Sequence, residues 1–233
     1  MPVLADFFDI KRGLATGDNS YFILNTEQIA AHHLPMEVFR PILPSPRYIT
    51  MDEIMADTQG YPLVERQLFL LDCRLPAERV KERYPALWTY FEEGEKRGIA
   101  KRYLCLHRTP WYSQEERPAP PLICTYMGRS NRKHGQLFRF MLNHSQATVA
   151  NVYLALYPKP HLAAVLENNP DLIRQIWEVL RKIHPETLMG EGRVYSEGLH
   201  KLEPKELANV PAQAIAELLP ASITASNIQI SLF

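Results

Sequence analysis

The side chains best suited to bind a ligand near the start of the chain lie in a polar loop bracketed by Gly13 and Gly17. Arg12, Thr16 and Asn19 lie in or beside this loop, and each can donate a hydrogen bond. Glycine permits positive φ at both ends of such a turn, so backbone amides and these side chains can approach a partner closely. The same pattern also fits a plain tight turn between two short strands. We predict a contact surface here, with the plain turn as the alternative.

A second group of candidate side chains follows residues 102–109, a run that is typical of a strand. Pro110 prevents the strand from continuing, and Trp111 and Tyr112 are expected at its end beside Arg108. Flat amphipathic rings next to a guanidinium suit stacking or groove contacts. An isolated tryptophan more often closes a hydrophobic core, so burial of Trp111 is the alternative.

The apolar run 122–127 predicts a strand that leads into a basic loop containing Arg129, Arg132 and Lys133. Loops of this composition between strands commonly meet phosphates or base edges. We predict that Arg108 or Arg129 binds guanine through paired hydrogen bonds, each pair giving about 1 to 3 kcal/mol of discrimination. Arg132 and Lys133 would mainly hold phosphates.

Positive charge is concentrated in the middle of the chain, although the chain as a whole is neutral. The 233 residues include 26 Lys and Arg and 26 Asp and Glu. Between Lys96 and Gln146, ten basic residues stand against two acidic ones, a net charge of +8. Such an excess favours one positive face that binds phosphates by displacing counterions. The alternative is that folding scatters these charges over several faces.

Length and composition predict a globular protein, because 46% of the residues are hydrophobic and can build a sizeable core. No apolar run reaches the roughly 18 residues of a membrane helix, and the N-terminus lacks a basic stretch followed by an apolar one. We therefore expect a cytoplasmic protein. Cys73, Cys105 and Cys124 lie in apolar runs without Cys-x-x-Cys spacing, which predicts reduced core thiols.

Other catalytic chemistry has little basis in the sequence. Glu203-Pro204-Lys205 matches part of a metal-dependent nuclease site, but no strand supplies the aspartate that should precede it. His32 and His33 lack a second cluster of ligands at metal-binding spacing. The sequence contains neither a nucleophile elbow nor a Gly-Lys-Ser/Thr phosphate loop. We predict neither nuclease activity nor a metal site.

Strand and helix patterns alternate along the remaining chain. Apolar runs predict strands at 67–72, 136–142 and 151–157, and prolines open predicted helices at 76–83 and 85–95. Asn169 can cap a helix that begins at Pro170, with an apolar stripe at 3.6-residue spacing to Ile183. We predict an α+β fold with a mixed, largely antiparallel sheet and packed helices, as one domain over 1–220 with a C-terminal tail over 221–233.

Five strings of sequence, taken in order, resemble one known family. They are FDIKRGLATGDN at 8–19, KERYP at 81–85, RTPWY at 108–112, FRFMLN at 138–143 and GLHKLEPKEL at 198–207. From about Leu4 to about Pro211 the chain is similar to the C-terminal target-recognition domain of adenine-specific DNA methyltransferases in restriction-modification systems. In that family the domain follows a catalytic domain, grips the major groove, reads bases and helps to hold a flipped adenine. The resemblance implies double-stranded DNA as a partner.

Two motifs of such methyltransferases do not occur in this sequence. They are the glycine-containing loop for S-adenosylmethionine and the Asn/Asp-Pro-Pro-aromatic motif; Asn169-Pro170 matches only a fragment of the second, and a helix cap explains it. The resemblance therefore implies a recognition module without methyl transfer of its own, with S-adenosylmethionine on a catalytic partner or a further domain. One alternative is a specificity or protein-interaction subunit that binds DNA only when docked to a methyltransferase or restriction subunit. Another is an intact enzyme with an unrecognised site for the methyl donor.

Overall fold

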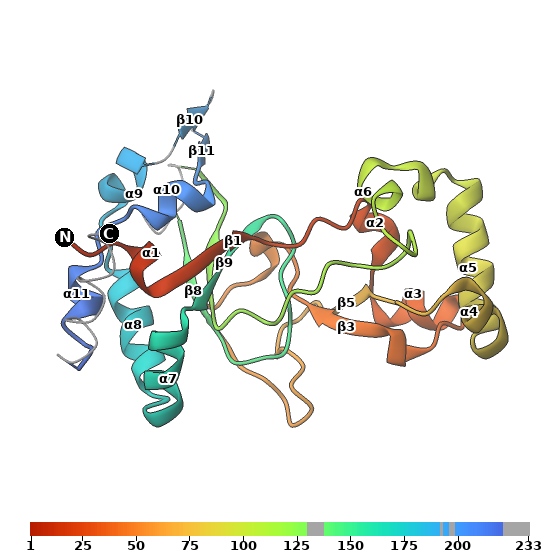
Figure 1. Cartoon of the computed structure of the whole chain (residues 1–233), viewed down its shortest axis with the longest axis horizontal. Helices are drawn as coiled ribbons and strands as arrows, with labels where there is room; N and C mark the ends of the chain where they lie inside the picture. The colour runs from red at the N-terminus through yellow and green to blue at the C-terminus, as the bar shows by residue number, and fades with distance from the viewer. Residues whose placement is uncertain (130–137, 192, 196–198, 221–233) are drawn as a thin grey trace. The chain divides into compact units, whose positions relative to one another are not determined.

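The computed structural model describes residues 1–129, 138–191, 193–195 and 199–220 (Figure 1). The chain forms two compact units, each with its own hydrophobic core. Unit 1 comprises Met1–Arg12, Pro120–Asn143 and Val152–Phe233, and unit 2 comprises Gly13–Ala119 and His144–Asn151. One recognition domain over 1–220 stays a prediction, and the expected tail at 221–233 lies outside the described residues.

An antiparallel sheet forms the centre of unit 1. Its strands lie in the order β1 (Phe8–Arg12), β9 (Tyr153–Pro158), β6 (Leu122–Thr125) and β8 (Phe140–Asn143). Across neighbouring strands, Ile10 is paired with Leu156, and Ile123 is paired with Ala155 on one side and with Met141 on the other. Every residue of β6 and β8 is buried, which explains why these strands are continuous apolar runs without alternation.

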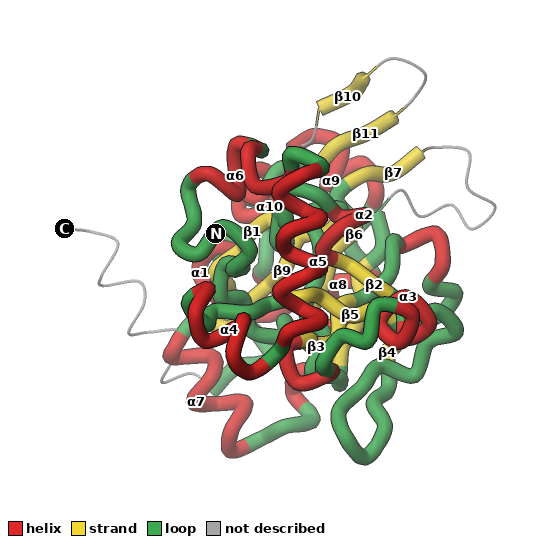
Figure 2. Tube along the Cα trace, turned by 90° about the vertical axis from the view of Figure 1, so that its right-hand side faces the viewer, coloured by secondary structure: helices red, strands yellow, loops and turns green. Residues whose placement is uncertain are grey.

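A smaller antiparallel sheet in unit 1 joins β7 (Met127–Arg129), β11 (Leu199–Lys201) and β10 (Arg193–Tyr195). Figure 2 shows these three strands side by side. Since β7 follows β6 after a single residue, the chain passes directly from the central sheet into the smaller one.

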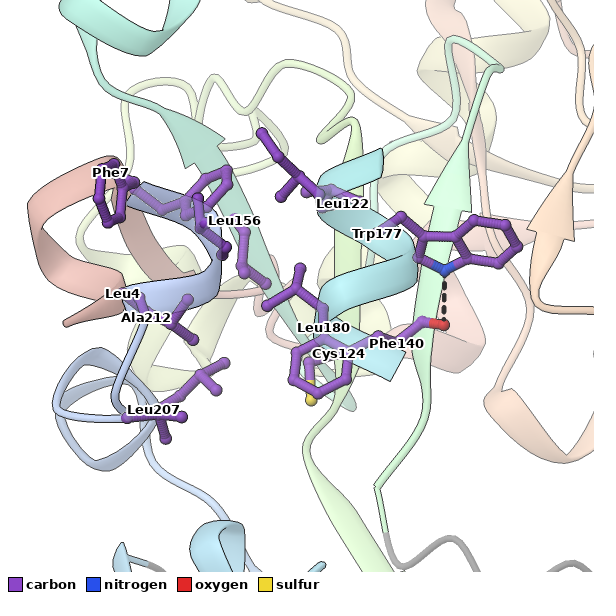
Figure 3. Packing of buried hydrophobic residues seen from close by; sticks show 14 of the residues in the cluster. Leu4, Phe7, Leu122, Cys124, Phe140, Leu156, Trp177, Leu180, Leu207 and Ala212 are labelled. Carbon is purple, nitrogen blue, oxygen red and sulfur yellow. Dashed lines mark hydrogen bonds between the residues drawn. The ribbon is translucent and has the colours of Figure 1, made fainter. Parts of the chain in front are cut away.

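Six helices belong to unit 1 in the part of the chain that the structure describes: α1 (Leu4–Phe7), α7 (Pro160–Asn168), α8 (Leu172–Arg181), α9 (Pro185–Glu191), α10 (Pro204–Ala208) and α11 (Gln213–Ala216). The apolar stripe of α8 buries Leu172, Ile176, Trp177 and Leu180 in the core. The Trp177 indole N–H donates to the Phe140 carbonyl of β8 at 3.0 Å (Figure 3). The predicted helix is confirmed, although it begins at Leu172 rather than at Pro170.

Unit 2 contains a three-stranded antiparallel sheet in the order β2 (Ile23–Leu24), β5 (Leu68–Leu71) and β3 (Phe39–Ile42), together with β4 (Glu53–Ile54). Its helices are α2 (Asn19–Phe22), α3 (Thr26–Ala31), α4 (Ala77–Arg83), α5 (Pro85–Lys96) and α6 (Tyr103–Leu106), with 3₁₀ turns η1 (Met36–Val38), η2 (Pro46–Tyr48) and η3 (Ile99–Lys101). The predicted helices at 76–83 and 85–95 and the strand at 67–72 are confirmed within a residue or two.

Aromatic rings build the core of unit 2 around α5. Tyr21 stacks on Tyr90 with ring centroids 4.6 Å apart, and Phe91 stacks on Tyr112 at 3.9 Å. The Tyr112 hydroxyl donates to the Leu75 carbonyl at 2.6 Å. Burial raises the pKa of Tyr90 and of Tyr112 to about 12, so both phenols stay neutral and keep their hydrogen bonds at physiological pH.

The predicted α+β class is confirmed, but three local expectations are wrong. The run 102–109 forms α6 rather than a strand, and the second strand expected after the opening loop is preceded by helix α2. Gly17 has φ +95°, as expected. At position 13 glycine is needed for a different reason than a positive φ: a Cβ there would lie 2.1 Å from the Ala150 carbonyl oxygen, so no larger residue fits.

The three cysteines are free and buried, as predicted. Among the described residues no helix has the length and apolar character needed to span a bilayer.

Candidate nucleic-acid interface

The opening loop is held against the segment that contains α6. Arg108 donates from both terminal guanidinium nitrogens, to the Thr16 carbonyl at 2.7 Å and to the Ala15 carbonyl at 2.7 Å. Burial lowers the pKa of Arg108 from its ordinary value, yet the two hydrogen bonds require the charged planar group that arginine provides. Arg108 therefore positions the loop.

Asp18 fixes the other side of the same loop. As the N-cap of α2 it accepts hydrogen bonds from the Ser20 amide at 2.9 Å, the Ser20 hydroxyl at 2.6 Å and the Tyr21 amide at 3.2 Å. Arg102 pairs with the carboxylate at 2.9 Å and donates to the Gly17 carbonyl at 3.3 Å. The loop and the segment before α6 are thus joined by an ion pair and by backbone contacts.

Asp18 makes the stability of this region depend on pH. Burial alone would raise the pKa of Asp18, but the Ser20 hydrogen bonds and the charge of Arg102 bring it below its ordinary value of 3.8. A lowered pKa in the folded state gives stability that is present above pH about 4 and is lost as the pH falls further. We expect Asp18→Asn to cost about 1 to 2 kcal/mol at pH 7 and progressively less below pH 4.

Chemical denaturation of both proteins between pH 7 and pH 2.5 measures this difference. Asp171→Asn is a matched control, since Asp171 is the N-cap of α8 without a side-chain capping bond. A difference between wild type and Asp18→Asn that does not change with pH would contradict the role of the charge.

Around this junction several side chains point outward, and we call them the α6 surface: Asn19, Lys101, Arg102, Tyr103, Leu106 and His107. Tyr103 is 75% exposed and Leu106 is 64% exposed. The His107 ring lies 4.4 Å from the Tyr103 ring, between centroids, and its Nδ1 lies 2.7 Å from the Tyr103 carbonyl. Cys105, between the two exposed residues, is completely buried and anchors the helix in the core.

Of the predicted contact residues in unit 2, only Asn19 is exposed. Thr16 is 1% exposed and donates from its hydroxyl to the Asn19 side-chain oxygen at 2.7 Å, so it orients the Asn19 amide. Trp111 packs against Phe22 and Phe91 and donates to Glu95 at 3.1 Å. Tyr112 is 2% exposed. The expected position of Trp111 and Tyr112 at the end of a strand is wrong; the alternative of core packing holds for Trp111, and Tyr112 is buried as well.

The predicted contact residues of unit 1 belong to a different environment. Arg12 lies over the Tyr126 ring at 4.1 Å. The Tyr126 hydroxyl donates to Glu203 at 2.8 Å, and Lys201 pairs with the same carboxylate at 2.6 Å. Although burial would raise the pKa of Glu203, these hydrogen bonds lower it, so Glu203 stays ionised in a structural ion pair.

Three further predicted contacts cannot be placed in unit 1. Arg129 ends β7, and its side chain lies outside the described part of the structure. Arg132 and Lys133 lie in the segment 130–137, which is also outside the described residues.

Sequence reasoning missed Tyr103, Leu106 and His107 as candidate contacts, and it counted Lys101 and Arg102 only as part of the basic stretch. A run of four apolar residues, 103–106, fits a buried strand as well as one turn of helix, and periodicity cannot separate them. One available signal was Gly98, which has φ +77° and follows α5 as a C-terminal glycine should. It marks a new segment after α5, but it does not reveal which of its residues face outward.

Comparisons with known proteins show the family of this chain. The family model "Type II methyltransferase M.Eco57I, C-terminal domain" matches residues 1–229, and the chain belongs to this family. The chain is 26% identical over 218 residues to Type II methyltransferase M.XamI of Xanthomonas campestris pv. amaranthicola, covering 92% of this chain and 37% of that protein. It is 23% identical over 199 residues to M.AccI of Acinetobacter calcoaceticus, covering 85% of this chain and 34% of that protein.

The predicted resemblance to C-terminal domains of restriction-modification methyltransferases is confirmed. The chain spans about a third of the length of the curated relatives that it matches.

Proposed function

We propose that this chain recognises a short sequence in double-stranded DNA on behalf of an adenine-specific Type II methyltransferase. The α6 surface is the observation that carries the proposal. It combines exposed cations, an amide and an aromatic ring on one rigid junction, and these are the groups that contact phosphates, base edges and base faces. Membership of a methyltransferase family makes DNA the natural partner.

Electrostatics favour the approach of DNA to this surface. Residues 96–114 contain five lysines and arginines and no aspartate or glutamate. The nearby carboxylate of Asp18 is paired with Arg102, and Lys101 is an exposed cation beside that pair. Phosphates of the duplex would replace the counterions that such a segment collects.

Asn19 is the residue best suited to read a base on this surface. Since Thr16 donates to its side-chain oxygen, the amide has a fixed orientation. An asparagine amide pairs with the N6 and N7 positions of adenine in the major groove. We assign phosphate contacts to Lys101 and Arg102, and positioning of the loop to Arg108, Asp18 and Thr16.

The methyl donor would bind elsewhere. The glycine-containing loop for S-adenosylmethionine and the Asn/Asp-Pro-Pro-aromatic motif do not occur in this sequence. A catalytic domain or subunit would supply both, in line with the larger size of the curated relatives. The alternative, a subunit that binds DNA only when docked to its catalytic partner, fits the neutral charge of the whole chain.

Replacing Lys101 by alanine tests the phosphate contact. We expect weaker binding to all duplex sequences alike, and a reduction of about 0.9 in the slope of log affinity against log salt concentration. Fluorescence anisotropy of labelled duplexes at several salt concentrations measures both, with and without the catalytic partner and S-adenosylmethionine.

Lys81→Ala is the matched control for this experiment. Lys81 is an exposed lysine of α4, at the end of α5 opposite to α6, roughly 18 Å away along a 12-residue helix. An equal loss from Lys81→Ala, or binding that ignores salt, would contradict the assignment. Binding that appears only with the partner would favour the docked subunit.

A further inference from the structure

We infer that Tyr103 and Leu106 form an apolar wedge that enters the DNA duplex and binds base steps that are already unstacked more tightly than regular ones. This inference rests on the proposed function, because it names how the α6 surface would engage DNA. It concerns two side chains that sequence reasoning did not select.

The helix α6 presents these two side chains together. Tyr103 and Leu106 are three residues apart, so they lie on the same side of the single helical turn. Apart from Met1, they are the most exposed large hydrophobic residues in the described part of the chain. Cys105 is buried in the core of unit 2, which holds the turn in place while its neighbours project outward.

The Tyr103 ring is held before any ligand binds. His107 lies against it at an interplanar angle of 42° and contacts the Tyr103 carbonyl through Nδ1. A ring that is already ordered loses less conformational entropy when it inserts or stacks. Leucine and aromatic side chains on a basic surface are the groups that proteins insert between base steps.

The charge around the apolar pair favours DNA over a protein as its partner. Lys101 and Arg102 directly precede the pair and are exposed, and no acidic residue occurs between 96 and 114. Arg108 follows the pair, but its guanidinium is engaged with the Ala15 and Thr16 carbonyls. Exposed cations beside an apolar pair match a base step flanked by phosphates.

The test compares two duplexes of identical sequence, one fully paired and one with a central abasic site, where unstacking costs less. We expect the wild-type full chain, with its catalytic partner if binding requires it, to prefer the abasic duplex by about fivefold or more. The double variant Tyr103→Ala/Leu106→Ala should lose this preference while it keeps its Tm and circular dichroism spectrum. Tyr103→Phe keeps the ring and should keep the preference.

Two controls separate the wedge from other effects. Leu63→Ala removes a side chain that is also about half exposed in the same unit but is not directly preceded by lysine or arginine, and it should leave the preference unchanged. Lys101→Ala should weaken binding to both duplexes equally.

The failures of the two proposals are distinguishable. Salt-dependent duplex binding without any preference for the abasic duplex would overturn the wedge and leave the proposed function standing. A double variant that keeps the preference but no longer associates with the catalytic partner would show that the pair docks to protein, and would also overturn the wedge. Absence of DNA binding by the wild type under every condition would overturn both.

Discussion

Replacing Trp177 by alanine should lower the free energy of unfolding by about 3 to 5 kcal/mol, because it empties the space of a large ring in the core of unit 1. Trp177 is 4% exposed and lies on the buried face of α8. Its indole N–H also donates to the Phe140 carbonyl of β8, which ties the helix to the central sheet. Urea denaturation followed by far-ultraviolet circular dichroism measures the change.

Two further variants divide this effect into its parts. Trp177→Phe keeps most of the ring volume but removes the N–H, and should cost about 1 to 3 kcal/mol. Glu178→Ala, on the exposed side of the same helix, should stay within about 0.5 kcal/mol of wild type. If Trp177→Ala were as mild as Glu178→Ala, α8 would not be a main support of the sheet.

Replacing Arg108 by alanine should cost about 2 to 3 kcal/mol of stability and most of the affinity for duplex DNA. The guanidinium is half-buried and donates to the Ala15 and Thr16 carbonyls, which would both lose a charged donor. Without it, the loop that presents Asn19 is no longer held on the segment that contains α6. Chemical denaturation and duplex anisotropy should therefore change together.

Two further variants show whether Arg108 acts by holding the loop in place or only by its positive charge. Arg108→Lys keeps the charge but not the planar fork, so we expect it to recover only a small part of the loss. Lys101→Ala removes one exposed positive charge and should leave stability within about 0.5 kcal/mol of wild type. Normal stability of Arg108→Ala, with discrimination lost at a single guanine, would instead assign Arg108 to base recognition.

Much of the secondary structure could be predicted from the sequence because its signals are local. The α8 stripe repeats every 3.6 residues, and Pro85 stands at the first position of α5, where proline fits a helix. The runs that became β5, β6 and β9 are too apolar to lie at the surface. Local patterns failed at α6, where four apolar residues did not distinguish a helical turn from a strand.

The candidate site depends on contacts between residues that are distant in sequence. Arg108 was selected from its neighbours, but its hydrogen bonds reach residues 92 and 93 positions away, so its role could not be read locally. The sequence leaves Trp111 either at the end of a strand or in the core, and only the structure shows that it packs against aromatic rings of α2 and α5.

The sequence by itself determined the class of fold, the family and the presence of a basic segment and of a glycine-bracketed loop. These follow from composition, periodicity and ordered strings of residues. Only the tertiary structure decided that Tyr112 is buried while Tyr103 is exposed, and that Gly13 is required by the carbonyl of Ala150. The physical reason is that burial and close approach are set by partners far along the chain, and identical residue types meet opposite environments.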